Sequence, residues 1–123
     1  MEILNAEIKN AELTMEEYGC LSLYLTLSGS GWGVVFGGRC LGKGYLGAKE
    51  FVGSAKGTEE IMRIMDVVGV ERFTDLKGKY VRVVSKGWGE TISKIGNILE
   101  DKWFDYKEFY GGGDDDKEEV EVH

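Results

Sequence analysis

The 123-residue sequence lacks proline altogether and contains one histidine and two cysteines. The histidine is the last residue, His123, beyond a run of glycines. The folded part therefore has no imidazole for a general base, a metal cluster or a catalytic triad. A Gly-x-Ser-x-Gly turn and a Walker phosphate loop are also absent. We expect no enzyme, no metal site and no cofactor; a carboxylate- or lysine-based hydrolase is the catalytic alternative left open.

The small number of cysteines and the shortness of the apolar runs bear on the cellular location of the protein. Cys20 and Cys40 are too few for a disulfide framework and lie in apolar, strand-like segments, so we expect reduced core cysteines. The longest apolar runs, such as Val34-Val35-Phe36, are far shorter than the roughly 20 residues that span a bilayer. The amino-terminal residues lack the pattern of a secretory signal. We expect no membrane association and a cytoplasmic location.

The net charge of −7 is concentrated at one end of the chain. Six acids and one lysine lie between Asp114 and His123, which leaves a charge of −2 for the first 113 residues. A nearly neutral body offers no broad basic field for a DNA duplex, so we expect no duplex binding. The glycines at 111–113 predict a flexible hinge, and the acidic remainder predicts a disordered tail.

Alternating apolar residues predict three consecutive strands. Residues 3–14 alternate with a change of phase at Lys9-Asn10, which indicates a bulge. Residues 20–28 show the clearest period of two, with leucine at 21, 23, 25 and 27. Residues 32–41 follow the turn at 28–31. An antiparallel meander is the natural arrangement of these strands.

The second half of the chain predicts one main helix and two more strands. The glycine-rich stretch 42–57 cannot be a regular helix at ordinary cost. Thr58 is a plausible N-cap, and Gly69 ends the helical spacing. A short helical turn at 71–76, a strand at 80–85 and a last strand or strand pair at 90–99 follow. The predicted order is β-β-β-α-β-β, an α+β fold with residues 1–110 as a single domain and 111–123 as hinge and tail.

Glycines beside aromatic rings and cations suggest a binding pocket. Glycine permits close backbone approach, an indole or phenol can stack on a base, and arginine or lysine can meet a phosphate. Core or turn roles for the same residues remain the alternative. The predicted ligand-binding residues are Trp32, Arg39, Lys43, Tyr45, Arg82, Lys86 and Trp88.

The segment from Lys102 to Tyr110 contains five aromatic residues in nine. We expect Trp103 and Phe104 to close the core. The remaining aromatic residues could form a dimer or partner surface through Trp103–Tyr110, because exposed aromatic clusters usually mark interaction sites. A homo-oligomer is therefore a further expectation.

Three stretches together carry a family resemblance. They are GVVFGG at 33–38, VVGVERFTDLKGKYVRV at 67–83 and IGNILEDKWF at 95–104. The combination resembles a family of small, mostly uncharacterised phage and prophage proteins, over roughly residues 20–110. The turn at residues 84–92 departs from the family pattern, in which it is more polar and often contains histidine.

The resemblance implies a counter-defence role in an infected bacterial cell. Small phage proteins without catalytic motifs often sequester nucleotide signals of host immunity or bind a host nuclease. Our leading hypothesis is a sponge that binds a cyclic ADP-ribose or cyclic dinucleotide without cleaving it. The alternatives are a protein inhibitor of a defence nuclease, of the anti-CRISPR type, and an accessory protein of phage replication that binds single strands.

Overall fold

The computed structural model describes residues 2–16, 19–44, 50–85, 92 and 94–111. Within them lie seven strands of one antiparallel sheet, two α-helices and one 3-10 turn, η1. Their order along the chain is β1 (Glu2–Met15), β2 (Cys20–Gly29), β3 (Trp32–Lys43), β4 (Val52–Gly53), α1 (Ala55–Val68), η1 (Phe73–Leu76), β5 (Tyr80–Ser85), β6 (Lys94–Asn97), β7 (Trp103–Asp105) and α2 (Tyr106–Phe109). None of the helices described is long and apolar enough to cross a membrane.

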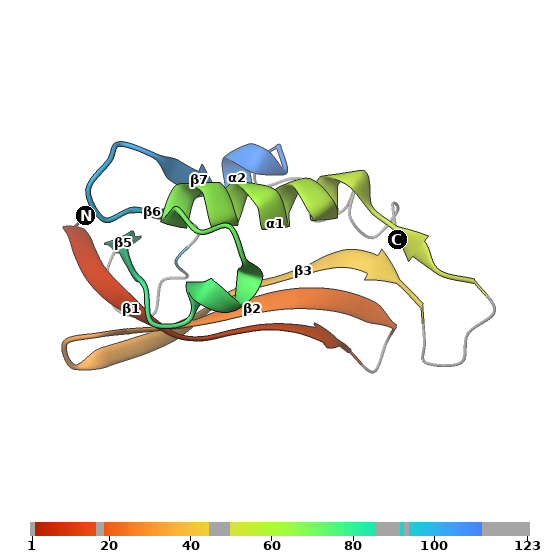
Figure 1. The fold of residues 1–123 in the computed structure, drawn as a ribbon, viewed down its shortest axis with the longest axis horizontal. Helices are drawn as coiled ribbons and strands as arrows, with labels where there is room; N and C mark the ends of the chain where they lie inside the picture. The colour runs from red at the N-terminus through yellow and green to blue at the C-terminus, as the bar shows by residue number, and fades with distance from the viewer. Residues whose placement is uncertain (1, 17–18, 45–49, 86–91, 93, 112–123) are drawn as a thin grey trace.

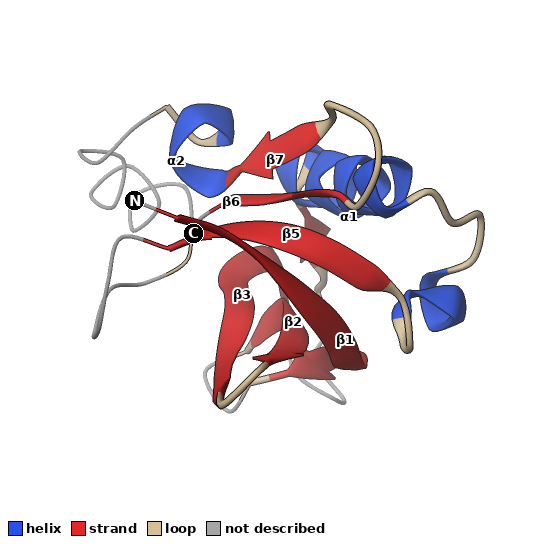
Figure 2. Cartoon of the chain, turned by 90° about the vertical axis from the view of Figure 1, so that its left-hand side faces the viewer, coloured by secondary structure: helices blue, strands red, loops and turns tan. Residues whose placement is uncertain are grey.

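The sheet curls around α1. Its strand order is β4-β3-β2-β1-β5-β6-β7, and α1 contacts β3 toward one edge and both β6 and β7 toward the other (Figures 1 and 2). A helix can reach both sides of a sheet only if the sheet bends across it. The apolar side chains on the concave face, on α1 and on the segments beside them make one buried core: Ala6, Ile8, Leu23, Leu25, Leu27, Phe36, Leu41, Ile64, Val67, Leu76, Val81, Val83, Ile95, Phe104 and Tyr106.

The first three strands confirm the predicted meander. Leu23, Leu25 and Leu27 are fully buried, as their alternation indicates. The register of β1 against β2 shifts between Ile8 and Asn10, where the sequence changes phase. The bulge lets Ile8 and Ala11 both face the sheet's concave side, because an extra residue restores the alternation.

The main helix begins earlier than predicted. Ser54, not Thr58, is the N-cap, and its hydroxyl accepts a hydrogen bond of 3.0 Å from the backbone N–H of Gly57. A side chain at position 57 would lie 2.7 Å from the Cα and the carbonyl oxygen of Leu41 in β3. Glycine is therefore required here by helix–strand packing. The helix ends as predicted at Gly69, whose φ of 91° suits glycine and whose N–H donates to the Met65 carbonyl.

The predicted order β-β-β-α-β-β is wrong in its details. A two-residue strand, β4, pairs with the end of β3 before the helix. The region 90–99 contributes one described strand, β6, and the aromatic segment adds β7 and the short helix α2. The α+β class is retained, with a mostly antiparallel sheet and one main helix. The predicted hinge and tail fall almost wholly on residues 112–123, which lie outside the described residues.

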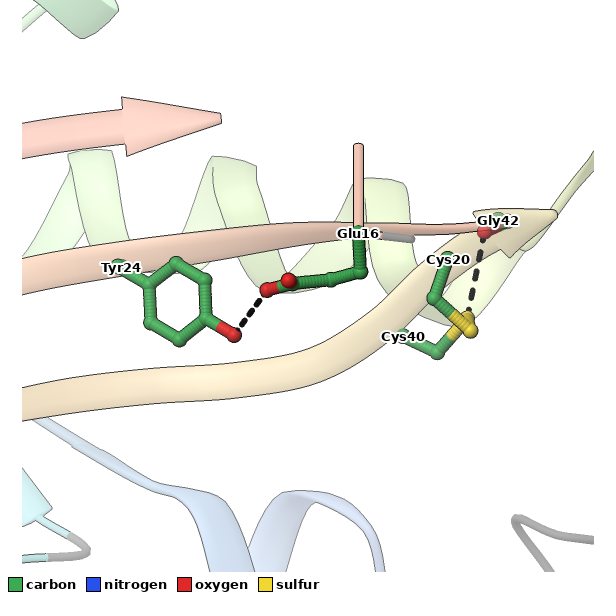
Figure 3. The surroundings of a disulfide bond; sticks show 5 residues. All are labelled: Glu16, Cys20, Tyr24, Cys40 and Gly42. Carbon is green, nitrogen blue, oxygen red and sulfur yellow. Dashed lines mark hydrogen bonds between the residues drawn. A yellow bond between two sulfur atoms is a disulfide. The ribbon is translucent and has the colours of Figure 1, made fainter. Parts of the chain in front are cut away.

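The prediction of two reduced cysteines is also wrong. Cys20 on β2 and Cys40 on β3 form a disulfide, with their α-carbons 5.2 Å apart (Figure 3). The β2–β3 register is irregular on both sides of Ser22, and this irregularity sets the two cysteines diagonally across the strand pair. Spacing of 20 residues could not reveal the pairing, because it depends on register rather than on sequence distance.

Candidate functional site

The sequence-predicted ligand residues do not converge on one site in the described structure. Trp32 lies at the β2–β3 hairpin, half-buried against the core, and Lys43 is exposed at the end of β3. Arg39 is on β3 and Arg82 is on β5, with β2 and β1 between those strands. The other three, Tyr45, Lys86 and Trp88, lie outside the described residues.

Arg82 belongs to a cross-strand row on the convex face of the sheet. Asn5 of β1 pairs with Arg82, Arg82 pairs with Gly96 of β6, and Gly96 pairs with Trp103 of β7. Directly opposed residues of antiparallel strands share a face, so these four lie side by side. Val81 and Val83, the neighbours of Arg82, are fully buried on the other face. The predicted outward direction of Arg82 is confirmed.

Trp103 lies flat over Gly96. A methyl group built at Gly96 would lie between 2.4 and 2.7 Å from three atoms of the indole, so the ring covers that α-carbon. The indole N–H donates a 2.8 Å hydrogen bond to Asp101, which fixes the ring orientation. Trp103 is half-buried and is not part of the apolar core, so the prediction that it closes the core is wrong.

Two cations lie over this ring. The guanidinium carbon of Arg82 lies 4.7 Å from the ring centroid, and Lys94 Nζ lies 5.1 Å from it. We call Arg82, Lys94, Gly96 and Trp103 the Trp103 platform. Arg82 was predicted from the sequence, whereas Lys94 and the place of Trp103 on the convex face were not. The platform residues occupy positions of three strands whose side chains point to the convex face. The strand register is needed to show that these positions are neighbours.

The two cations differ in how they are held. Arg82 Nε donates to the Asn97 carbonyl at 2.6 Å, and Nη2 donates to the Glu100 carbonyl at 2.7 Å. These bonds tie β5 to the turn between β6 and β7. Lys94 makes no ion pair within the described residues, so its charge is the one that the platform can direct at a ligand.

A second cluster lies under α2, around Glu60 of α1. Glu60 is fully buried, and its two carboxylate oxygens accept hydrogen bonds from the phenols of Tyr106, at 2.5 Å, and Tyr110. The Arg39 guanidinium lies 4.5 Å from the Tyr110 ring centroid and 5.9 Å from that of Tyr106. We call these four residues the Glu60 cluster.

Burial dominates the electrostatics of the Glu60 cluster. It raises the pKa of Glu60, although the two phenol hydrogen bonds and the Arg39 charge act in the opposite direction. The pKa values of Tyr106 and Tyr110 are also raised, first by burial and then by the neighbouring carboxylate. A carboxylate enclosed in this way holds α2 against α1 and has no exposed atom with which to meet a substrate.

The aromatic segment 103–110 is used mostly inside the protein. Phe104 is buried, which confirms that part of the prediction, and its ring lies 5.3 Å from that of Tyr106 and 5.2 Å from that of Phe109. Phe109 and Tyr110 are half-buried and pack on the core. Of the five rings, Trp103 is the one that lies apart from this stack on the convex face.

Comparisons of the chain with protein-family models, with curated proteins and with solved structures give no match. No relative therefore assigns a role to these residues. Within the described residues, no group of three histidine, cysteine, aspartate or glutamate side chains could hold a metal ion.

Proposed function

We propose that the chain is a non-catalytic binding protein for a small nucleotide-derived anion, which it holds on the Trp103 platform. One observation carries the proposal: an indole lies flat on the convex face of the sheet, with the charges of Arg82 and Lys94 within 4.7 and 5.1 Å of its centroid. A planar base stacks on an indole, and a phosphate attached to that base meets a cation.

The contacts of the residues at the platform indicate a different role for each of them. Asp101 orients the indole, and Arg82 holds the turn beside it while contributing positive charge. Lys94, which makes no ion pair within the described residues, supplies the ammonium for a phosphate. The row from Asn5 to Trp103 contains no nucleophile paired with a base, and it contains no acid. The platform therefore supports retention of a ligand rather than its cleavage.

The resemblance to small phage proteins supplies the biological context of the proposal. A phage gains from removing an immune signal if that signal is bound tightly and stoichiometrically. The ligand class is then the nucleotide signals of host immunity, such as cyclic ADP-ribose and cyclic dinucleotides, and the site of action is the infected bacterial cell.

The direct test is binding and recovery of intact ligand. Purified protein is titrated with a panel of cyclic ADP-ribose isomers, cyclic dinucleotides and mononucleotides by calorimetry, then heated, and the released ligand is identified by chromatography. We expect one class to bind and to be recovered unchanged. Absence of binding across the panel contradicts the proposal, and recovery of a hydrolysed product contradicts its non-catalytic part.

The platform is tested by Trp103→Leu with Trp32→Leu as the matched control. Both indoles cover a glycine on the paired strand, since a methyl group at Gly29 would lie 2.2 Å from the Trp32 ring. Stacking contributes about 1–3 kcal/mol per base, so Trp103→Leu should weaken binding roughly 5- to 150-fold. Trp32→Leu should leave the affinity within about twofold, because no described cation lies over that ring.

The charge of Lys94 gives a second comparison. Lys94→Ala should weaken binding up to about fivefold and reduce its salt dependence, as expected for an ion contact at the protein surface. Lys43→Ala is the matched control, because Lys43 is an exposed lysine at the end of β3, three strands away from β5. Equal losses from both lysine variants would show that general charge, not the platform, attracts the ligand.

A further inference from the structure

We infer that the ligand contains two bases joined by a phosphodiester, with the second base on Tyr80. The inference rests on the proposed function and names the ligand class of the same face. Tyr80 is the first residue of β5, two residues before Arg82, so its side chain shares the convex face. Its exposed fraction is 56%, which is high for an aromatic residue within a sheet.

The register places Tyr80 at a useful distance from Trp103. Arg82 lies one alternation along β5 from Tyr80 and two strands across from Trp103, through Gly96. Because the indole lies over Gly96, one strand across from Arg82, a rise of about 3.3 Å per residue and a strand spacing of about 4.8 Å put the ring roughly 8 Å from the α-carbon of Tyr80. That separation suits two bases splayed apart on one molecule and is too long for two stacked neighbours. Arg82 lies between the two rings, where the linking phosphate would be.

The neighbours of Tyr80 do not oppose an anion. The residue opposite it on β1 is Glu7, whose carboxylate is already paired with Lys9 at 3.1 Å. Asp101 is held by the indole N–H, and Asp105 caps the backbone of α2 through the N–H groups of Lys107 and Glu108. The acids nearest the row are therefore engaged with protein groups.

The number of cations limits the length of the ligand. Arg82 and Lys94 are the two positive side chains that lie over the Trp103 ring in the described residues. A long single strand needs a track of cations that follows successive phosphates, whereas a dinucleotide has only one or two. The face therefore fits a free dinucleotide better than a nucleic-acid strand.

The test compares ligands and variants in one titration series. The probes are a mononucleotide, a linear dinucleotide, a cyclic dinucleotide and a twelve-residue single-stranded oligonucleotide. We expect a dinucleotide to bind roughly 5- to 150-fold more tightly than the mononucleotide. Tyr80→Ala should remove that advantage while leaving mononucleotide affinity unchanged. Phe51→Ala is the matched control, because Phe51 is another exposed ring, at 65%, beside the opposite edge strand β4.

The outcomes separate this inference from the proposed function. Equal affinity for mononucleotide and dinucleotide, unchanged by Tyr80→Ala, overturns the two-base ligand and leaves the platform intact. Binding that is tightest for the oligonucleotide overturns the free dinucleotide in favour of a strand. Binding of a cyclic ADP-ribose isomer but of none of these probes overturns the two-base ligand and leaves the proposed function standing, and binding of neither overturns the proposed function itself. Melting temperatures of Tyr80→Ala and Phe51→Ala close to that of the wild type confirm that each variant is folded.

Discussion

Glu60 has the least ordinary environment of the residues described. A fully buried carboxylate is stable only when hydrogen bonds and charge replace its hydration, and Tyr106, Tyr110 and Arg39 provide both. The compensation is incomplete, because burial still raises the pKa of Glu60 above its ordinary value. The contact between α2 and α1 therefore includes an unfavourable term, the desolvation of the Glu60 carboxylate.

The raised pKa predicts a pH-dependent stability. Between the ordinary carboxyl pKa, about 4.3, and the raised pKa of folded Glu60, the folded state binds more protons than the unfolded state. The contribution of Glu60 to the free energy of unfolding is therefore present at low pH and is lost as the pH rises through the folded pKa. Relative to the wild type, Glu60→Gln should become more stable as the pH rises above about 4.3, until the raised pKa of folded Glu60 is passed, measured by urea denaturation at a series of pH values.

The matched control for this prediction is Glu59→Gln. Glu59 lies on the same helix turn, but its carboxylate pairs with Arg63 at 2.5 Å and is partly exposed. Its substitution removes a charge from the same helix turn without touching the buried cluster, so the part of the pH response that Glu59→Gln does not share is the part specific to Glu60. A difference for Glu60→Gln that stays flat, or that falls with pH, would show that the carboxylate is ionised at no extra cost in the folded protein.

Among the elements, those with a strong local pattern were predictable and those set by packing were not. The leucines of β2 and the phase change in β1 fixed three strands, because alternation alone reports burial on one face. The start of α1 was missed because Gly57 has low helix propensity, and nothing in the sequence shows that Leu41 will lie against it. The platform was half-found for the same reason: Arg82, Lys94 and Trp103 meet through the pairing of three strands.

Gly57→Ala tests the packing of α1 on β3. Alanine is the better helix former by about 1 kcal/mol, so propensity alone predicts stabilisation. The added methyl group would lie 2.7 Å from the Leu41 backbone, which cannot move cheaply within the sheet. We expect the overpacking to outweigh the gain in helix propensity and to lower the free energy of unfolding by about 1–3 kcal/mol, measured by chemical denaturation.

Gly53→Ala provides the comparison for Gly57→Ala. A methyl group at Gly53 in β4 would meet no heavy atom within 4 Å, so the substitution should change stability by less than about 0.5 kcal/mol. Stabilisation by Gly57→Ala would mean that α1 lies farther from β3 than the structure places it.

At the scale of the whole molecule, one side of the curled sheet is braced covalently and the other by packing. The disulfide joins β2 to β3 near the β4 edge, while α1 and α2 link that side to β6 and β7 (Figure 1). The disulfide conflicts with the expected cytoplasmic location, because a reducing compartment keeps cysteines as thiols. In such a compartment the fold would depend on its core and on the Glu60 cluster alone.

Reduction of the Cys20–Cys40 bond therefore measures how much the covalent link contributes. The bond closes a loop with a sequence separation of 20 residues, for which the chain-entropy model gives about 3 kcal/mol. We expect the oxidised protein to lose most of that free energy of unfolding in excess reductant, while it still unfolds in one transition. The variant with Cys20→Ser and Cys40→Ser should match the reduced wild type and should not respond to reductant. If protein kept without reductant and protein in excess reductant unfold at the same denaturant concentration, the covalent link adds no stability and the sheet holds its curvature without it.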